Sequence, residues 1–139
     1  MERILVAEDD ADLRELIEVA LQEDSYEVRG VGDGCSALDE LTRFTPDLVL
    51  VDLGLPHLSG HDVLRHLRDQ LPFGRVPVIA ISGKFTFEAL PTKWFLAKPL
   101  DLDLMLRVVG ELCGRRLPAP FWVQQPETAR RREGVAFRP

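Results

Sequence analysis

Acidic side chains stand at the ends of two short apolar runs in this 139-residue sequence. Glu8, Asp9 and Asp10 follow the run at residues 3–7, and Asp52 closes a second run rich in Val and Leu. Runs this short are typical of strands buried on both faces of a parallel sheet. The carboxyl ends of such strands border the crevice in which these sheets bind ligands. The spacing therefore predicts that these acids converge at one edge of a sheet.

Carboxylates that lie close together raise one another's pKa, so such a cluster is costly unless a cation joins it. Mg²⁺ is the expected cation, because it binds a few carboxylate oxygens, keeps several waters and takes a further ligand from a phosphate. Ser82 and Lys98 close two later apolar runs and would lie alongside the acids. In the alternative interpretation the acids only cap the following helix, a role that we predict for Asp10.

The spacing of apolar residues predicts the elements that position these side chains. Strands and helices alternate, which predicts an α/β fold with a doubly wound, five-stranded parallel sheet and right-handed crossovers. Ser36 is expected to cap the second helix. The expected strands are residues 3–7, 26–31, 48–51, 76–81 and 94–97, and the expected helices are 11–23, 37–41, about 61–70 and 102–112.

The segment from Gly83 to Lys93 interrupts this alternation, because it has to hold a helix and two loops. A mean helix alone takes about 11 to 12 residues and each loop roughly 2 to 6, so at most one or two helical turns fit. We therefore expect a shortened or irregular fourth helix.

Charge divides the chain into an acidic domain at residues 1–114 and a basic, proline-containing tail or linker at 115–139. The first part has 11 Lys and Arg against 21 Asp and Glu, and the second has six Arg against two Glu. The arginine triplet at 130–132 lacks interleaved aromatic residues, so a nucleic-acid partner is not favoured. Cys35 and Cys113 lack metal-binding spacing, and neither a signal segment nor a long apolar span occurs, so we expect a cytoplasmic protein without a membrane partner.

Five short motifs follow one another at the predicted strand ends: Ile4–Asp10, Val51–Pro56, Ser59-Gly60, Ile81–Gly83 and Lys98-Pro99. In this order they resemble the receiver domain of bacterial two-component response regulators. The resemblance covers about residues 2–114. It implies a flavodoxin-like, receiver-type fold in which an aspartate accepts a phosphoryl group from the phosphohistidine of a partner kinase.

The resemblance implies a role for each acid of the cluster. Asp52 would be the phosphoacceptor, a carboxylate nucleophile that forms an aspartyl phosphate. Asp9 and Asp52 would bind Mg²⁺ directly, Glu8 would bind it through water, and the backbone carbonyl of Gly54 would be a further ligand.

The remaining motifs match residues that respond to the phosphoryl group in this family. Lys98 would pair with phosphoryl oxygens, because phosphoryl transfer depends chiefly on charge neutralisation and positioning. Ser82 would donate its hydroxyl to a phosphoryl oxygen, and Phe95 would be the aromatic switch residue that rotates inward. The peptide bond before Pro99 would be cis, as is usual for the family's proline at this position.

The resemblance also implies partners and limits the chemistry. A sensor histidine kinase or phosphotransfer protein would supply the phosphoryl group, and the only reactions would be self-catalysed phosphotransfer and dephosphorylation. Receivers switch or dimerise through the face around their fourth helix. In this chain the short segment from Gly83 to Lys93 would change that face. The last expected helix is apolar nearly all round, so a homodimer through it is a further hypothesis.

Alternatives from other functional classes stay open beside this interpretation. One is a receiver-like interaction adaptor that works without phosphorylation. Another is an aspartate-nucleophile phosphatase, which typically needs a second acid two residues after the nucleophile, where this chain has Gly54. A nucleotide-binding fold is disfavoured, because Gly32-Asp33-Gly34 lacks the third glycine and lies in the wrong loop.

Overall fold

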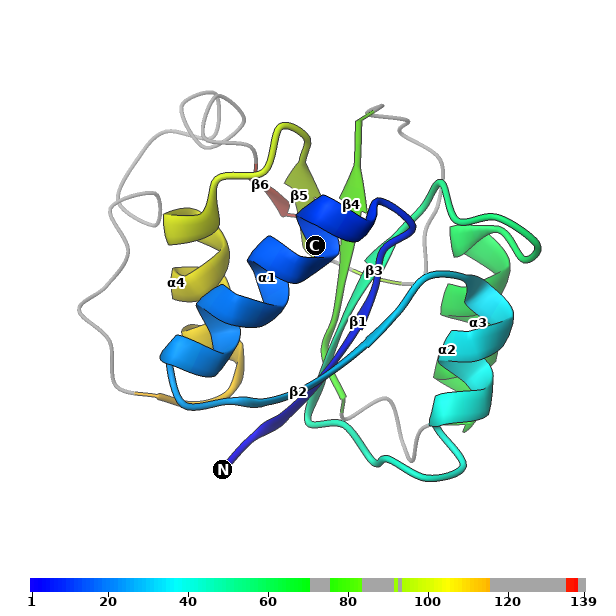
Figure 1. Ribbon diagram of the computed structural model, residues 1–139, viewed down its shortest axis with the longest axis horizontal. Helices are drawn as coiled ribbons and strands as arrows, with labels where there is room; N and C mark the ends of the chain where they lie inside the picture. Colours follow the sequence, from blue (N-terminus) through cyan, green and yellow to red (C-terminus); the bar gives the residue numbers. More distant parts are fainter. Residues whose placement is uncertain (71–75, 84–91, 93, 116–134, 138–139) are drawn as a thin grey trace.

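The computed structural model describes residues 1–70, 76–83, 92, 94–115 and 135–137. Its centre is a single sheet in the order β2-β1-β3-β4-β5-β6, in which the first five strands are parallel and β6 is antiparallel to β5 (Figure 1). The strands are β1 (Arg3–Ala7), β2 (Glu27–Val31), β3 (Leu48–Asp52), β4 (Val78–Ser82), β5 (Trp94–Ala97) and β6 (Val135–Phe137).

Helices cover both faces of the sheet (Figure 1). On one face lie α1 (Ala11–Glu23) and α4 (Leu102–Leu112), and on the other lie α2 (Gly34–Glu40) and α3 (Gly60–Gln70). The doubly wound, five-stranded parallel sheet expected from the sequence is therefore confirmed, with one antiparallel strand added to its β5 edge.

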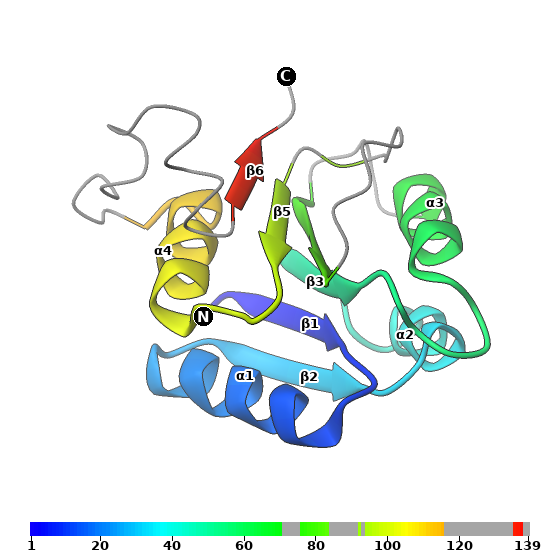
Figure 2. The ribbon, with the colours of Figure 1, turned by 90° about the horizontal axis from the view of Figure 1, so that it is seen from above.

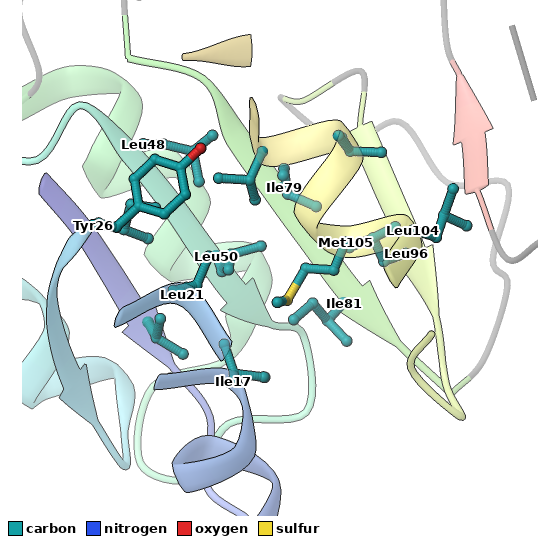
Figure 3. Close-up of a cluster of buried hydrophobic side chains, with 14 residues drawn as sticks. Ile17, Leu21, Tyr26, Leu48, Leu50, Ile79, Ile81, Leu96, Leu104 and Met105 are labelled. Carbon is teal, nitrogen blue, oxygen red and sulfur yellow. The ribbon is translucent and has the colours of Figure 1, made fainter. Parts of the chain in front are cut away.

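Two hydrophobic cores form because successive side chains of a strand point to opposite faces. In β1, Ile4 and Val6 pack toward α1 and α4, while Leu5 and Ala7 pack toward α2 and α3. Figure 3 shows the first core, in which side chains of α1 and α4 meet those of the central strands. Burial of both faces explains why the central strands read as continuous apolar runs.

The expected element boundaries hold to within one residue, except at the starts of the second helix and the fourth strand. The second helix begins at Gly34 and not after Ser36, because Asp33 is its N-cap and accepts a hydrogen bond from the Ser36 N–H group. Aspartate and serine are comparable caps, so composition alone did not distinguish them. The fourth strand begins at Val78, two residues later than expected. The expected shortened fourth helix lies on residues 83–93, almost all of which are outside the described residues.

The apolar residues of α4 are accounted for by the core. Leu104, Met105, Val108 and Val109 are buried, and the other leucines of α4 pack against the same core as partly buried side chains. Among the described residues, the exposed large hydrophobic side chains belong to Met1, Leu16 and Val19. The leucines of α4 outside the core keep part of their surface, and the homodimer hypothesis stays a prediction. Within the same residues, no helix has the length and apolar character needed to cross a membrane.

Arg115 joins the end of α4 to the start of the chain. Its guanidinium donates two hydrogen bonds to the carboxylate of Glu2, at 2.9 and 3.1 Å, and lies 3.7 Å from the centroid of the Tyr26 ring. It also donates to the backbone carbonyl of Asp24. These contacts of Arg115 lie at the end of the sheet where β1 begins.

Candidate functional site

The predicted acidic cluster forms where β1 and β3 end side by side. Ala7 pairs with Val51, so the residues that follow, Glu8 and Asp52, reach the same edge of the sheet. Glu8, Asp9 and Asp52 each offer a carboxylate oxygen, and these oxygens all lie within 4.8 Å of one another. Glu8 is fully buried, Asp52 is 4% exposed and Asp9 is exposed to solvent. The sequence prediction that these acids converge is therefore confirmed.

Lys98 enters the cluster from the end of β5. Its backbone N–H group donates to the carbonyl of Ser82 and so continues the pairing of β5 with β4. Its Nζ lies 2.8 Å from Oε1 of Glu8 and donates to Oδ2 of Asp52 at 2.9 Å. One ammonium thus contacts two carboxylates. Sequence reasoning placed Lys98 alongside the acids but did not predict that it would bridge them.

The electrostatics of the cluster follow from its burial. Burial, followed by the neighbouring Asp52, raises the pKa of Glu8 to about 8, although Lys98 opposes this rise. Burial also acts against ionisation of Asp52, yet hydrogen bonds with Glu8, the Gly54 N–H group and Lys98 hold its pKa below the ordinary value. One lysine thus contacts two buried carboxylates, and burial disfavours the ionised form of Glu8 in particular.

A divalent cation fits this donor set. Oε2 of Glu8 is buried without a hydrogen-bond partner among the described residues, which is costly for a carboxylate oxygen. A second cation beside Asp9 would compensate the charge that Lys98 leaves unneutralised. The set consists of carboxylate oxygens only, which suit a hard cation such as Mg²⁺ better than zinc or copper, for which imidazole and thiolate are the usual ligands.

Two residues near the cluster, Asp10 and Gly54, make hydrogen bonds with different roles. Asp10 caps α1, because its side chain accepts hydrogen bonds from the N–H groups of Asp12 and Leu13. The capping role predicted for Asp10 is confirmed, and capping does not account for Glu8 or Asp9. In the β3 loop, the Gly54 N–H group donates to Oδ1 of Asp52 at 3.0 Å and fixes the orientation of that carboxylate.

Arg14 is a contributor that the sequence analysis missed. Its Nη1 donates to the backbone carbonyl of Glu8 at 2.8 Å, and its Nε lies 3.7 Å from Oε1 of Glu18. The β2 strand leaves room for this pair with Gly30, where a Cβ atom would lie 1.7 Å from the same oxygen of Glu18. Arg14 therefore ties α1 to the loop that bears the acids. The available signal was a basic residue one helical turn after the Asp10 cap.

The other residues implied by the resemblance lie on β4 and β5, the two strands beyond β3. Ser82 ends β4 and pairs with Ala97 of β5, and Phe95 is a buried residue of β5, 8% exposed. The Lys98–Pro99 peptide bond is cis, as the resemblance implies. Ser82 and Lys98 thus flank the acids on the two strands beyond β3.

Comparisons with known proteins agree with this geometry. The sequence model of the response regulator receiver domain matches residues 4–109. The DNA-binding response regulator MtrA of Mycolicibacterium paratuberculosis is 40% identical over 83 residues, which cover 60% of this chain and 36% of that protein. The sensory transduction protein RegX3 of Mycolicibacterium smegmatis is 39% identical over 84 residues, with 60% and 36% covered. The match thus extends over little more than a third of the length of these relatives.

Solved structures show the same fold. The receiver domain of sensor histidine kinase PA1611 from Pseudomonas aeruginosa, with a magnesium ion coordinated in its active site cleft, is 29% identical with a TM-score of 0.72, covering 81% of this chain and 98% of that one. The response regulator TrrA from Thermotoga maritima, in complex with Mg²⁺-BeF, is 27% identical with a TM-score of 0.70, covering 81% and 99%. This chain belongs to the response regulator receiver domain family.

Proposed function

We propose that the chain accepts a phosphoryl group on Asp52, in a Mg²⁺-dependent reaction, from the phosphohistidine of a sensor histidine kinase or phosphotransfer protein. The observation that supports this most is the convergence of Asp52 with Glu8, Asp9 and the Lys98 ammonium at one sheet edge. Family membership supports a role in two-component signalling. The aspartyl phosphate would then switch the surface through which the domain contacts its target.

The chemistry assigned to Asp52 is nucleophilic attack by a carboxylate oxygen on phosphorus. The P–N bond to the donor histidine breaks as the new P–O bond forms, and the histidine keeps the electron pair of the broken bond. The depressed pKa of Asp52 keeps this carboxylate ionised for the attack. The Gly54 N–H group holds one of its oxygens in place.

The residues around Asp52 would bind the metal and the transferred group. Asp9 and Asp52 would hold Mg²⁺ directly, together with the Gly54 carbonyl, and Glu8 would hold it through a water molecule. The bound metal would neutralise charge on the phosphoryl oxygens. With the Glu8 charge compensated in this way, Lys98 would be available to pair with a phosphoryl oxygen.

The proposed switch passes from the site to the neighbouring strands. The Ser82 hydroxyl would donate to a phosphoryl oxygen and draw the end of β4 inward. Phe95 on β5 would then rotate inward as the end of β4 moves. Ser82 lies on β4, which pairs with β3, and Phe95 lies on β5, which pairs with β4.

Titration with beryllofluoride, a phosphoryl mimic, tests this proposal. Trp122→Phe leaves Trp94, which neighbours Phe95, as the only indole reporter. We expect a fluorescence change that requires Mg²⁺ and is lost in Asp52→Asn but kept in Asp69→Asn, the control at an exposed aspartate of α3. Absence of binding by the parent protein would refute the proposal and favour an adaptor that works without phosphorylation.

A further inference from the structure

The outer edge of β5 is covered by the end of the chain itself. Val135–Phe137 forms β6 and pairs antiparallel with β5, with Trp94 opposite Phe137 and Leu96 opposite Val135. Figure 2 shows β6 in red beside β5, at the edge of the sheet opposite β2.

An edge strand such as β5 presents unpaired N–H and C=O groups that can pair with any extended chain. The β6 pairing extends along three residues of β5 and satisfies those groups among them that point toward β6. Short edge strands and covered edges are two ways in which proteins prevent association between sheets. The segment Val135–Phe137 therefore binds to the edge of β5 as an added strand.

The length of the connection determines which copy of β5 the segment can reach. Residues 116–134 connect Arg115 to β6, and a connection of 19 residues can span at most about 65 Å. A covalent connection raises the local concentration of β6 at β5 of the same molecule. Pairing within one molecule is thus favoured over pairing with a second copy at low protein concentration.

We propose that the outer edge of β5 is a strand-docking surface whose resident occupant is the chain's own segment Val135–Phe137, bound within the same molecule. Occupation by β6 closes this edge to a second copy of the chain. The surface lies on the strand that bears Phe95 and leads into Lys98, so any other strand that docks on β5 has to displace β6 first. The proposal does not depend on phosphorylation of Asp52.

A cysteine pair placed across the two strands tests the register and the origin of the occupant. Opposite Cα atoms of antiparallel strands lie about 4.5 to 5.5 Å apart, within the range that a disulfide spans. Trp94→Cys with Phe137→Cys, in the 139-residue chain lacking Cys35 and Cys113, is oxidised at low concentration with oxidised glutathione. Trp94→Cys with Ala136→Cys is the matched control, because neighbouring side chains of a strand point to opposite faces.

The products are followed by intact mass and by non-reducing electrophoresis. We expect a disulfide within one molecule that forms at least about tenfold faster in the 94/137 pair than in the 94/136 control, because only the first pair shares a face. A disulfide-linked dimer as the main product would overturn the proposal in favour of a second copy as the occupant. Equal rates for the two pairs would show that β6 has no fixed register on β5, and would also overturn it.

Hydrogen exchange provides a second measurement that retains Trp94. Two variants of the 139-residue chain, Ala136→Pro and the double variant Val135→Pro with Phe137→Pro, together remove every N–H group that β6 can donate. We expect the β5 amides that face β6 to exchange at least about tenfold faster in these variants. The Lys98 amide, which bonds to Ser82, should be unchanged and is the internal control. Unchanged exchange along β5 in both variants would contradict the proposal.

Discussion

Replacing Lys98 by methionine should destabilise the metal-free protein, because Lys98 is the cation that contacts both buried carboxylates. Its Nζ lies 2.8 Å from Glu8 and 2.9 Å from Asp52. Methionine retains most of the length and apolar contacts of the lysine stem while removing the charge. The variant therefore tests the charge of Lys98 more than its packing.

The magnitude follows from the exposure of the groups. Removing one partner of a fully buried ion pair costs about 3 to 5 kcal/mol. The Lys98 side chain is 28% exposed, and Glu8 can bind a proton because its pKa is already raised. Both features reduce the cost, so we expect the free energy of unfolding to fall by about 1 to 3 kcal/mol at neutral pH.

Urea denaturation in the presence of a chelator measures this loss. Arg65→Met is the control, because the Arg65–Asp62 pair spans 3.6 Å between side chains that are 71% and 46% exposed. Such a surface pair contributes about 0.5 kcal/mol or less. Saturating Mg²⁺, or Asp52→Asn in the same chain, should recover most of the stability lost with Lys98, because each reduces the uncompensated negative charge.

Two results would refute this reasoning. If Lys98→Met lost no more stability than Arg65→Met, the bridge between the carboxylates would contribute nothing to the fold. If the loss were large but insensitive to both Mg²⁺ and Asp52→Asn, it would come from packing and not from charge.

Two further predictions concern contacts away from the bridge. Arg14→Met should weaken Mg²⁺ binding by roughly tenfold, because Arg14 positions the Glu8 backbone. Calorimetry measures the affinity, and the circular dichroism spectrum should stay unchanged. An unaltered Mg²⁺ affinity would refute this prediction. Arg115 lowers the pKa of Glu2 to about 2, so this pair stabilises the fold above about pH 4.5 and the contribution is lost as pH falls toward 2. Glu2→Gln should therefore cost about 1 kcal/mol at neutral pH and flatten acid unfolding between these values, whereas a parallel acid curve would contradict it.

The sequence was sufficient to predict the fold and the acidic cluster, because both depend on short, regular patterns of residue types. Continuous apolar runs predicted the central strands, since these are buried on both faces. The carboxyl ends of parallel strands share one edge, so the order of Glu8, Asp52 and Lys98 along the chain was enough to bring them together.

Other features depend on tertiary contacts that periodicity does not encode. The contact of Arg14 with the Glu8 carbonyl depends on the angle between α1 and β1. The choice of Asp33 over Ser36 as the α2 cap depends on backbone geometry, since both residue types cap helices well. The β6 strand spans three residues, Val135–Phe137, which is too short for a recognisable alternation.

Direct phosphorylation tests the central claim most closely. The protein is incubated with the small phosphodonor acetyl phosphate, with Mg²⁺ or with a chelator, and its mass is measured before the modified residue is mapped after borohydride reduction. We predict a single phosphoryl group on Asp52 that requires Mg²⁺ and is absent from Asp52→Asn. No modification, or modification of another residue while Asp52 stays unmodified, would contradict the account.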